Sequence, residues 1–295
     1  MIIVKGLSKR FTAEKGLFDL NFEVQKGEVF GYIGPNGAGK STTIRHLMGF
    51  MKPDSGHSSI DGMDCWNNAA RIQEQTGYLP GEIVFLEGMT GLGFLSLVQK
   101  MRKQTSTKRR DELIERFQLD VKAPIRKMSK GMKQKVGIIA AFMHEPQVLI
   151  LDEPTSGLDP LMQRVFIDLI LEEKQNNKTI LMSSHSFQEI ERTCDSAGII
   201  KDGKLVALED MHRLRTVQRR VFEVKVKSEN DMNTILHSNL DTEVKGERTV
   251  HVTVQGNDQE FLQLLSGCEV QHIDTRPQDL EDIFMHYYDR REVTK

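Results

Sequence analysis

The chain has 295 residues, of which 38% are hydrophobic and 28% are charged, so it can bury a sizeable core and is not expected to be disordered. Its 40 basic and 42 acidic side chains give a formal net charge of −2, which argues against broad electrostatic binding to nucleic acid or to an anionic membrane. Three distant cysteines without a Cys-x-x-Cys pair favour a reducing compartment, and we expect neither a signal peptide nor a run of about 18–20 apolar residues that could span a membrane.

Strand-like and helix-like segments alternate from the beginning of the chain, which predicts an α/β architecture around a largely parallel sheet. Residues 17–24 alternate between apolar and polar side chains, as a half-buried strand does, and we expect them in an antiparallel region at an edge. A tight hairpin turn is predicted through Asp202 and Gly203. Short, almost continuously apolar runs are typical of central strands that are covered on both faces, and they occur at residues 28–33, 148–152, 179–184 and 197–200.

Residues 90–145 carry helical patterns with little strand signal, so we expect a helical subdomain, at about residues 85–145, inserted into the sheet. Thr90 can cap a helix that runs to about Lys103. A second helix is predicted over residues 110–117.

The pattern changes near the end of the chain, and we expect two domains, at residues 1–215 and 219–295. In the second domain the elements follow the order β-α-β-β-α-β of a ferredoxin-like unit, which indicates no function by itself. These elements are expected at residues 221–226, 231–238, 242–254 (a hairpin), 258–265 and 268–274, and a last helix is expected at 279–288.

The sequence GPNGAGKS has the spacing G-x-x-x-x-G-K-[ST] and stands between a predicted strand and a helical segment. Glycines allow backbone N–H groups to close around phosphate oxygens, and the N-terminus of a helix adds partial positive charge. In such a loop Lys40 reaches the terminal phosphates and Ser41 is a magnesium ligand. We therefore expect nucleotide contacts from Gly34, Pro35, Asn36, Gly37, Ala38, Gly39, Lys40, Ser41 and Thr42.

The segment VLILDEP supplies two consecutive carboxylates. Asp152 stands at the C-terminal end of an apolar strand, where a carboxylate can hold Mg²⁺, often through water. Side chains that follow each other on a strand point to opposite faces, so the two carboxylates need different roles, and we assign Glu153 as the general base for an attacking water. An exposed acidic pair is the simpler interpretation of this segment alone, but the phosphate loop favours the catalytic one.

With these motifs, residues 1 to about 210 resemble the ATP-binding cassette ATPases. MSKGMKQK stands where that family carries its signature Leu-Ser-Gly-Gly-Gln, with Ser129 and Gly131 retained and the other three positions different. In the family this segment caps a helix that faces the γ-phosphate bound to a second subunit, which implies nucleotide contacts for both residues. Considered without the family, Ser129 is a plausible N-cap.

The resemblance also implies roles for three further residues. Asp159, in SGLDP, matches a loop that organises the dimer interface. His185 follows a predicted strand where the family places a histidine that can bond the γ-phosphate, although a histidine after a strand is more often an ordinary surface residue. Phe11 matches the aromatic residue that stacks on adenine, with a core phenylalanine as the alternative.

One loop departs from the family pattern. The family commonly has Gln after Tyr-[Leu/Val]-Pro, whereas this chain reads GYLPGE, with Gly81 and Glu82. The Glu82 carboxylate is a candidate ligand for Mg²⁺ or for the attacking water, and an exposed loop acid is the alternative.

The resemblance implies a P-loop NTPase cassette with a RecA-like core sheet, an antiparallel β edge and a helical subdomain, followed by the ferredoxin-like domain. It implies an ATPase with ATP and Mg²⁺ as cofactors and with Lys40, Glu153 and His185 in catalytic roles. The GYLPGE loop and the C-terminal extension look like those of exporters of drugs, antibiotics or other amphipathic compounds. The implied partners are a separate transmembrane permease and a second copy of the chain, at the cytoplasmic face of the membrane, with no nucleic acid.

Two alternatives belong to other classes. A soluble cassette ATPase could act as a conformational clamp on the ribosome or on DNA, but the single phosphate loop and the lack of sustained heptads or of a strongly basic tract beyond residues 213–220 argue against it. A regulatory nucleotide binder without ATPase activity is disfavoured because Lys40, Asp152, Glu153 and His185 are all present.

Overall fold

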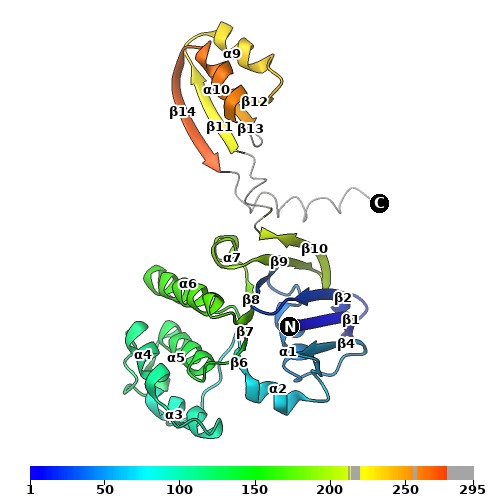
Figure 1. Ribbon diagram of the computed structural model, residues 1–295, viewed down its shortest axis with the longest axis vertical. Helices are drawn as coiled ribbons and strands as arrows, with labels where there is room; N and C mark the ends of the chain where they lie inside the picture. Colours follow the sequence, from blue (N-terminus) through cyan, green and yellow to red (C-terminus); the bar gives the residue numbers. More distant parts are fainter. Residues whose placement is uncertain (212, 214–219, 255–257, 278–295) are drawn as a thin grey trace. The chain divides into compact units, whose positions relative to one another are not determined.

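The computed structural model describes residues 1–211, 213, 220–254 and 258–277, and the chain divides into two compact units, Met1–Glu209 and Asp210–Lys295 (Figure 1). None of the helices in these described ranges is long and apolar enough to cross a membrane. Each unit has its own sheets and its own hydrophobic core.

An antiparallel sheet forms one side of the first unit, with Ile2 opposite both Val24 and Ile60. Its second strand buries Leu20, Phe22 and Val24 and exposes the polar residues between them, as the alternation predicted. Since this strand also ends the sheet order β2-β1-β4-β5, the predicted antiparallel edge strand is confirmed. The bounds are β1 (Ile2–Arg10), β2 (Gly16–Val24), β4 (Ser55–Ile60) and β5 (Met63–Asp64).

The central sheet has the order β10-β9-β3-β8-β7-β6. Its middle strands are buried along their whole length and pair in parallel, as their continuous apolar runs predicted. The predicted turn is also confirmed, because Asp202 and Gly203 adopt φ angles of 49° and 72° between β9 and β10. The bounds are β3 (Val29–Ile33), β6 (Thr76–Leu79), β7 (Val148–Asp152), β8 (Thr179–Ser184), β9 (Ser196–Lys201) and β10 (Lys204–Asp210).

The parallel register brings functional segments together. Ile33 lies opposite Ser184, and Asp152 lies opposite Ser183, so the C-terminal ends of β3, β7 and β8 meet at one edge of the sheet. This edge is where open α/β sheets bind their ligands. A shared core holds the two sheets of the unit together, and in it the rings of Phe22 and Phe30 stack with centroids 5.3 Å apart.

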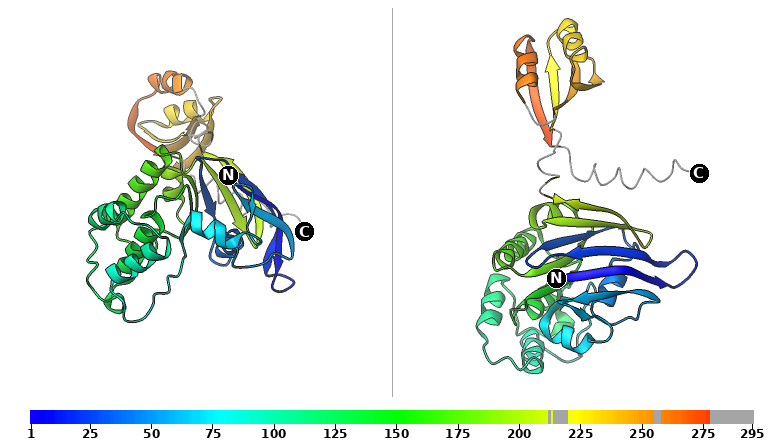
Figure 2. Two further views of the ribbon diagram at one scale, coloured as in Figure 1. Left: turned by 60° about the horizontal axis from the view of Figure 1, so that its bottom comes forward. Right: turned by 45° about the vertical axis from the view of Figure 1, so that its right-hand side comes forward.

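Helices complete the first unit, and α3, α4 and α5 form a helical group that lies on the other side of the unit from β1 and β2 (Figure 2). Thr90 caps α3 by accepting a 3.1 Å hydrogen bond from the backbone N–H of Gly93, as predicted. The helix ends at Met101, earlier than expected, and Lys103 just beyond it adopts a φ of 53°, which is outside the helical region. The bounds are α1 (Lys40–Leu47), α2 (Ala69–Gln75), α3 (Gly91–Met101), α4 (Lys108–Arg116), the 3₁₀ helix η1 (Ile125–Lys127), α5 (Lys130–Phe142), α6 (Pro160–Gln175) and α7 (Phe187–Thr193).

The second unit has the strand order β12-β13-β11-β14, with antiparallel neighbours throughout. This order confirms the ferredoxin-like unit, whose core includes the stacked rings of Phe222 and Phe261. The helix expected at 279–288 lies outside the described residues. The bounds are β11 (Arg220–Val226), α9 (Glu229–Leu236), β12 (Asp241–Gly246), β13 (Thr249–Val254), α10 (Asp258–Ser266) and β14 (Val270–Pro277).

Candidate nucleotide-binding site

The phosphate loop connects the buried strand β3 to α1, and two of its glycines are required by their surroundings. A Cβ atom on Gly34 would lie 2.4 Å from the carbonyl oxygen of Ile200, which is too close for any other residue. Gly39 has a φ of 112°, which side chains rarely tolerate, and a Cβ there would lie 2.7 Å from a methyl group of Leu17. These glycines let the loop backbone pack closely against its neighbours and lead into the N-terminus of α1, where unpaired N–H groups favour anions.

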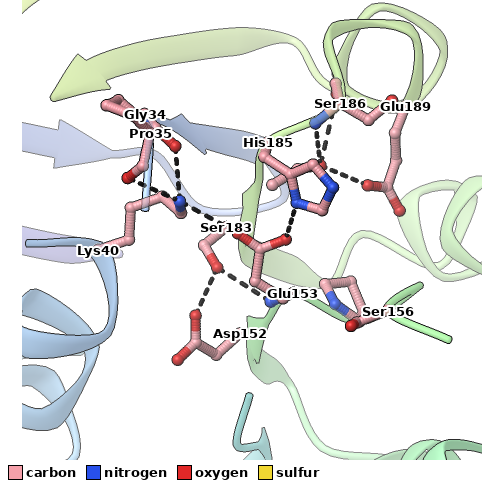
Figure 3. Close-up of polar contacts among 12 residues, drawn as sticks. Gly34, Pro35, Lys40, Asp152, Glu153, Ser156, Ser183, His185, Ser186 and Glu189 are labelled. Carbon is pink, nitrogen blue, oxygen red and sulfur yellow. Dashed lines mark hydrogen bonds and ion pairs between the residues drawn. The ribbon is translucent and has the colours of Figure 1, made fainter. Parts of the chain in front are cut away.

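Lys40 lies at the centre of this loop, with a side chain that is only 6% exposed. Its ammonium group donates a 2.6 Å hydrogen bond to the carbonyl oxygen of Gly34 and lies 3.1 Å from Oε1 of Glu153 (Figure 3). The lysine thus joins the phosphate loop to the end of β7. A cavity of about 180 Å³ lies here, and its described lining consists of Pro35, Asn36, Gly37, Gly39, Lys40, Ser41, Thr42 and Glu153.

Asp152 and Glu153 have different environments. The sequence predicted different roles for them from strand alternation, but a turn at Glu153 is what separates their side chains. Asp152 ends β7, is 3% exposed and accepts a 2.6 Å hydrogen bond from the Ser183 hydroxyl. Glu153 lies just beyond the strand with a φ of 49°, so a sharp turn directs its side chain, and the predicted strand alternation does not apply. The backbone N–H of Glu153 donates to the same Ser183 hydroxyl at 3.0 Å, which fixes the turn.

His185 follows β8 and reaches the second oxygen of this glutamate. Its Nδ1 lies 2.5 Å from Oε2 of Glu153, while the imidazole remains largely exposed. One carboxylate therefore contacts both the loop lysine and the histidine, as Figure 3 shows. Lys40 and His185, both expected to be catalytic, therefore contact the third such residue, Glu153.

The surroundings of Asp152 fit a magnesium ion. Its Oδ2 faces Gly81, where a Cβ would lie 3.2 Å away, so a glycine keeps space in front of this oxygen. Together with burial, the charge of Asp152 raises the pKa of Tyr78 to about 12. The described residues contain no cluster of three or more acidic, histidine or cysteine side chains suited to a metal. One carboxylate, one hydroxyl and substrate oxygens are the ligands with which Mg²⁺ is usually bound beside phosphates.

The signature segment and the loop before α6 touch each other within this chain. Ser129 is the N-cap of α5, as its sequence context allowed, and accepts a 3.2 Å hydrogen bond from the N–H of Met132. A Cβ on Gly131 would lie 2.5 Å from the carbonyl oxygen of Gly157. Asp159 caps α6 by accepting hydrogen bonds from two backbone N–H groups. Ser129, Gly131 and Asp159 are not among the described residues that line the cavity.

Two further expected site residues lie at the surface. Phe11 is 55% exposed between β1 and β2, which excludes a core phenylalanine, and it does not appear in the described lining of the cavity. Glu82 is exposed next to Gly81 and likewise does not line the cavity in the described part of the chain. The structure thus brings together the phosphate loop, Asp152, Glu153 and His185, and Glu82 directly follows the glycine that faces Asp152.

The sequence did not single out three polar residues that support this site. Ser183 binds both acidic residues of the turn, Gln134 of α5 donates to the carbonyl oxygens of Glu153 and Pro154, and Glu189 binds the Ser184 hydroxyl beside His185. Each is buried. Ser183 stands near the end of the apolar run TILMSS, which is a sequence signal for a buried hydroxyl, whereas Gln134 and Glu189 stand in polar segments that give no such signal.

Comparison with known proteins gives consistent matches. The family model "ABC transporter" matches residues 17–156. The bacitracin transport ATP-binding protein BcrA of Bacillus licheniformis is 34% identical over 97% of this chain and 96% of its own length. The linearmycin resistance ATP-binding protein LnrL of Bacillus subtilis is 29% identical over 97% of both proteins. None of these descriptions points to the ribosome or to DNA.

Solved structures agree with these relatives. The ATP-binding subunit of an ABC transporter is 36% identical, with a TM-score of 0.66 over 73% of this chain and 92% of the other. A dimeric bacterial ABC transporter cassette is 22% identical, with a TM-score of 0.66 over 72% of this chain and 99% of the other, and shows the shared fold. With the phosphate loop in place and a relative aligned along nearly its whole length, the chain belongs to the ABC transporter family, as an ATP-binding subunit.

Proposed function

We propose that this subunit hydrolyses ATP in the cavity between the phosphate loop and the turn at Glu153, and that it thereby powers an exporter of antibiotics or other amphipathic compounds. The observation that carries the proposal is the position of the Glu153 carboxylate. One oxygen lies 3.1 Å from the Lys40 ammonium, and the other lies 2.5 Å from the His185 imidazole. These two contacts support Glu153 as the general base.

The reaction follows from these contacts. Backbone N–H groups of the loop and the Lys40 ammonium bind the β- and γ-phosphates and compensate their charge. Glu153 accepts a proton from water while the water oxygen forms a bond to the γ-phosphorus and the bond to the ADP oxygen breaks. His185 holds the second oxygen of Glu153, which orients the base, and its exposed ring can bond the γ-phosphate.

Ser41 and Asp152 would hold Mg²⁺, with Glu82 as a further candidate ligand. A magnesium ion held there would supply positive charge that compensates the charge developing on the phosphate oxygens. Asp152 is prepared for this role, because Ser183 holds one of its oxygens and Gly81 leaves space at the other.

A second copy of the chain would complete the site. Ser129 and Gly131 stand at the N-terminus of α5 and are not among the described residues that line the cavity, which supports a role toward nucleotide held by another copy. In the proposed homodimer each signature segment binds the γ-phosphate held by the other copy, with Asp159 near the interface and Phe11 stacked on adenine. Closure around ATP and release after hydrolysis would drive the transport cycle.

The exporter class rests on the relatives. Two proteins that align with nearly the whole chain are described as a bacitracin transport protein and a linearmycin resistance protein. A separate transmembrane permease would supply the pathway, and the subunit would work at the cytoplasmic face of the membrane.

The proposal can be tested in an antibiotic-sensitive bacterium that expresses the chain together with the membrane protein encoded beside it. We expect the pair to raise the inhibitory concentration of bacitracin-like or linearmycin-like antibiotics several-fold, and we expect Lys40→Ala at equal expression to remove the effect. Lys52→Ala, which changes an exposed lysine outside the cavity, is the matched control. Equal protection by Lys40→Ala would contradict the proposal. It would also be contradicted if the wild-type pair protected against neither bacitracin-like nor linearmycin-like antibiotics.

A further inference from the structure

Glu189 is a buried acid that the reaction described above does not use. It lies in α7, is 5% exposed, and accepts a 2.6 Å hydrogen bond at Oε2 from the Ser184 hydroxyl. That hydroxyl oxygen also accepts a 2.9 Å hydrogen bond from the backbone N–H of Ser186. The Ser184 hydroxyl therefore links the two residues on either side of His185 to each other and to Glu189, which lies beside them in Figure 3.

Packing alone does not hold this loop. His185 and Ser186 border a groove of about 430 Å³, and the imidazole of His185 is 66% exposed. A side chain that faces open space keeps one orientation only when polar contacts hold it. Here these contacts are the bond between His185 and Glu153, the bond from Ser186 to the Ser184 hydroxyl, and the bond from that hydroxyl to Glu189.

The carboxyl group of Glu189 is buried without a paired cation in the described part of the chain, so its hydrogen bonds are important for its ionised form. No ion pair among the described residues includes Glu189. Its Oε1 atom is buried without a hydrogen bond of good geometry. The Thr155 hydroxyl is nevertheless near enough to favour the ionised form of Glu189. Burial raises the pKa of Glu189, and the charge of Glu153 raises it further, whereas His185 lowers it. A buried carboxyl group without a cation is costly when it is ionised. A purely structural position would be filled at lower cost by an apolar side chain.

We propose that Glu189 is a positioning residue that holds the segment from Ser184 to Ser186 and thereby aims His185 at Glu153. The inference rests on the proposed ATPase function and deepens it. Glu189 reaches Ser184 and not the phosphate loop, so it acts through His185.

The test uses the full chain and compares Glu189→Leu with Glu189→Gln. Glu189→Leu removes both oxygens at similar volume, so kcat should fall about tenfold or more while the Kd for ATP changes less than about twofold. Glu189→Gln can still accept from Ser184, so kcat should stay within about threefold of the wild-type value. Gln188→Leu, at the exposed neighbouring position, is the matched control and should leave both values unchanged.

A double-mutant cycle separates positioning from general stability. In a His185→Ala background Glu189→Leu should have little further effect on kcat, because the residue that it positions is gone. An equal loss in both backgrounds overturns the proposal. Ser184→Ala, a smaller change, should reproduce the loss if Glu189→Leu does not fold.

A measurement that does not depend on ATP hydrolysis tests the role of Glu189 separately from the proposed ATPase function. The imidazole NMR signal of His185 in the full chain should move in Glu189→Leu and stay in place in Gln188→Leu. An unchanged signal in Glu189→Leu overturns the positioning role. If the wild-type chain does not hydrolyse ATP, the ATPase proposal fails, and this signal still decides the role of Glu189.

Discussion

The side-chain amide of Gln134 donates a 2.8 Å hydrogen bond to the backbone carbonyl oxygen of Pro154, and the same nitrogen lies 3.3 Å from the carbonyl oxygen of Glu153. Gln134 is 3% exposed and lies in α5, the helix that begins at the signature segment. The helix is thereby tied to the turn that carries the proposed general base.

Removing this amide should therefore affect both stability and turnover. Gln134→Ala leaves the buried carbonyl oxygen of Pro154 without this donor, whereas the carbonyl oxygen of Glu153 keeps a hydrogen bond from the backbone N–H of Ser156. The loss costs about 1–3 kcal/mol of unfolding free energy, and kcat should fall because Glu153 is less well placed. Urea denaturation and ATPase assays measure the two effects. Lys135→Ala on the same helix is the control, and a Gln134→Ala protein with wild-type stability would contradict the prediction.

Lys40→Ala should weaken ATP binding and abolish turnover. The substitution removes the cation that faces the β- and γ-phosphates in the proposed site, and it also removes the partner of Glu153. Isothermal titration with ATP and a phosphate-release assay measure both effects, with the exposed Lys52→Ala as the control. Unchanged turnover in Lys40→Ala would rule out this assignment of the site.

Glu153→Gln should keep the shape of the turn but stop hydrolysis, so that ATP holds two chains together. Light scattering should then show a mass twice that of the 33.7 kDa chain after ATP is added. Adding Ser129→Arg should abolish this dimer, because a long cation would crowd the contact with the γ-phosphate, while each chain still binds ATP. Glu153→Gln with Ser106→Arg, an exposed serine elsewhere, should still dimerise. If the Ser129→Arg double variant dimerises equally well, the signature segment does not face nucleotide.

Deleting residues 219–295 should leave nucleotide binding intact. The described residues that line the nucleotide cavity all belong to Met1–Glu209. Fluorescent ATP analogues should bind the shortened chain with a Kd within about threefold of that of the full chain. Loss of binding in a shortened chain whose circular dichroism shows it folded would contradict the proposed division at residues 1–215 and 219–295.

His144 should make the protein less stable in acid. Burial, together with the charge of Arg102, lowers the pKa of His144 from 6.5 to about 4. Between these values the unfolded chain binds more protons than the folded chain, so the unfolding free energy falls as the pH falls, by about 2 kcal/mol between pH 7 and pH 5. In His144→Gln, which cannot titrate, urea denaturation should show a correspondingly smaller loss. His57→Gln, at an exposed histidine, should keep the wild-type slope, and an equal slope for His144→Gln would contradict the prediction.

Local sequence patterns were sufficient to predict the features that depend on neighbouring residues. The glycine spacing of the phosphate loop, the N-caps at Thr90 and Ser129 and the buried strand that ends at Asp152 were predicted because each depends on a few consecutive side chains. The order of elements in the second unit was predicted for the same reason.

Contacts between side chains that are distant in the sequence depend on the tertiary structure. The Glu153 carboxylate is directed by a turn with a φ of 49°, and Ser183 binds Asp152 because the register of two parallel strands places them side by side. Likewise, Gln134 and Glu189 are buried beside the site because helices pack there. Strand register and helix packing result from the whole core, since many weak contacts between remote segments fix them together, so no short stretch of the sequence contains this information.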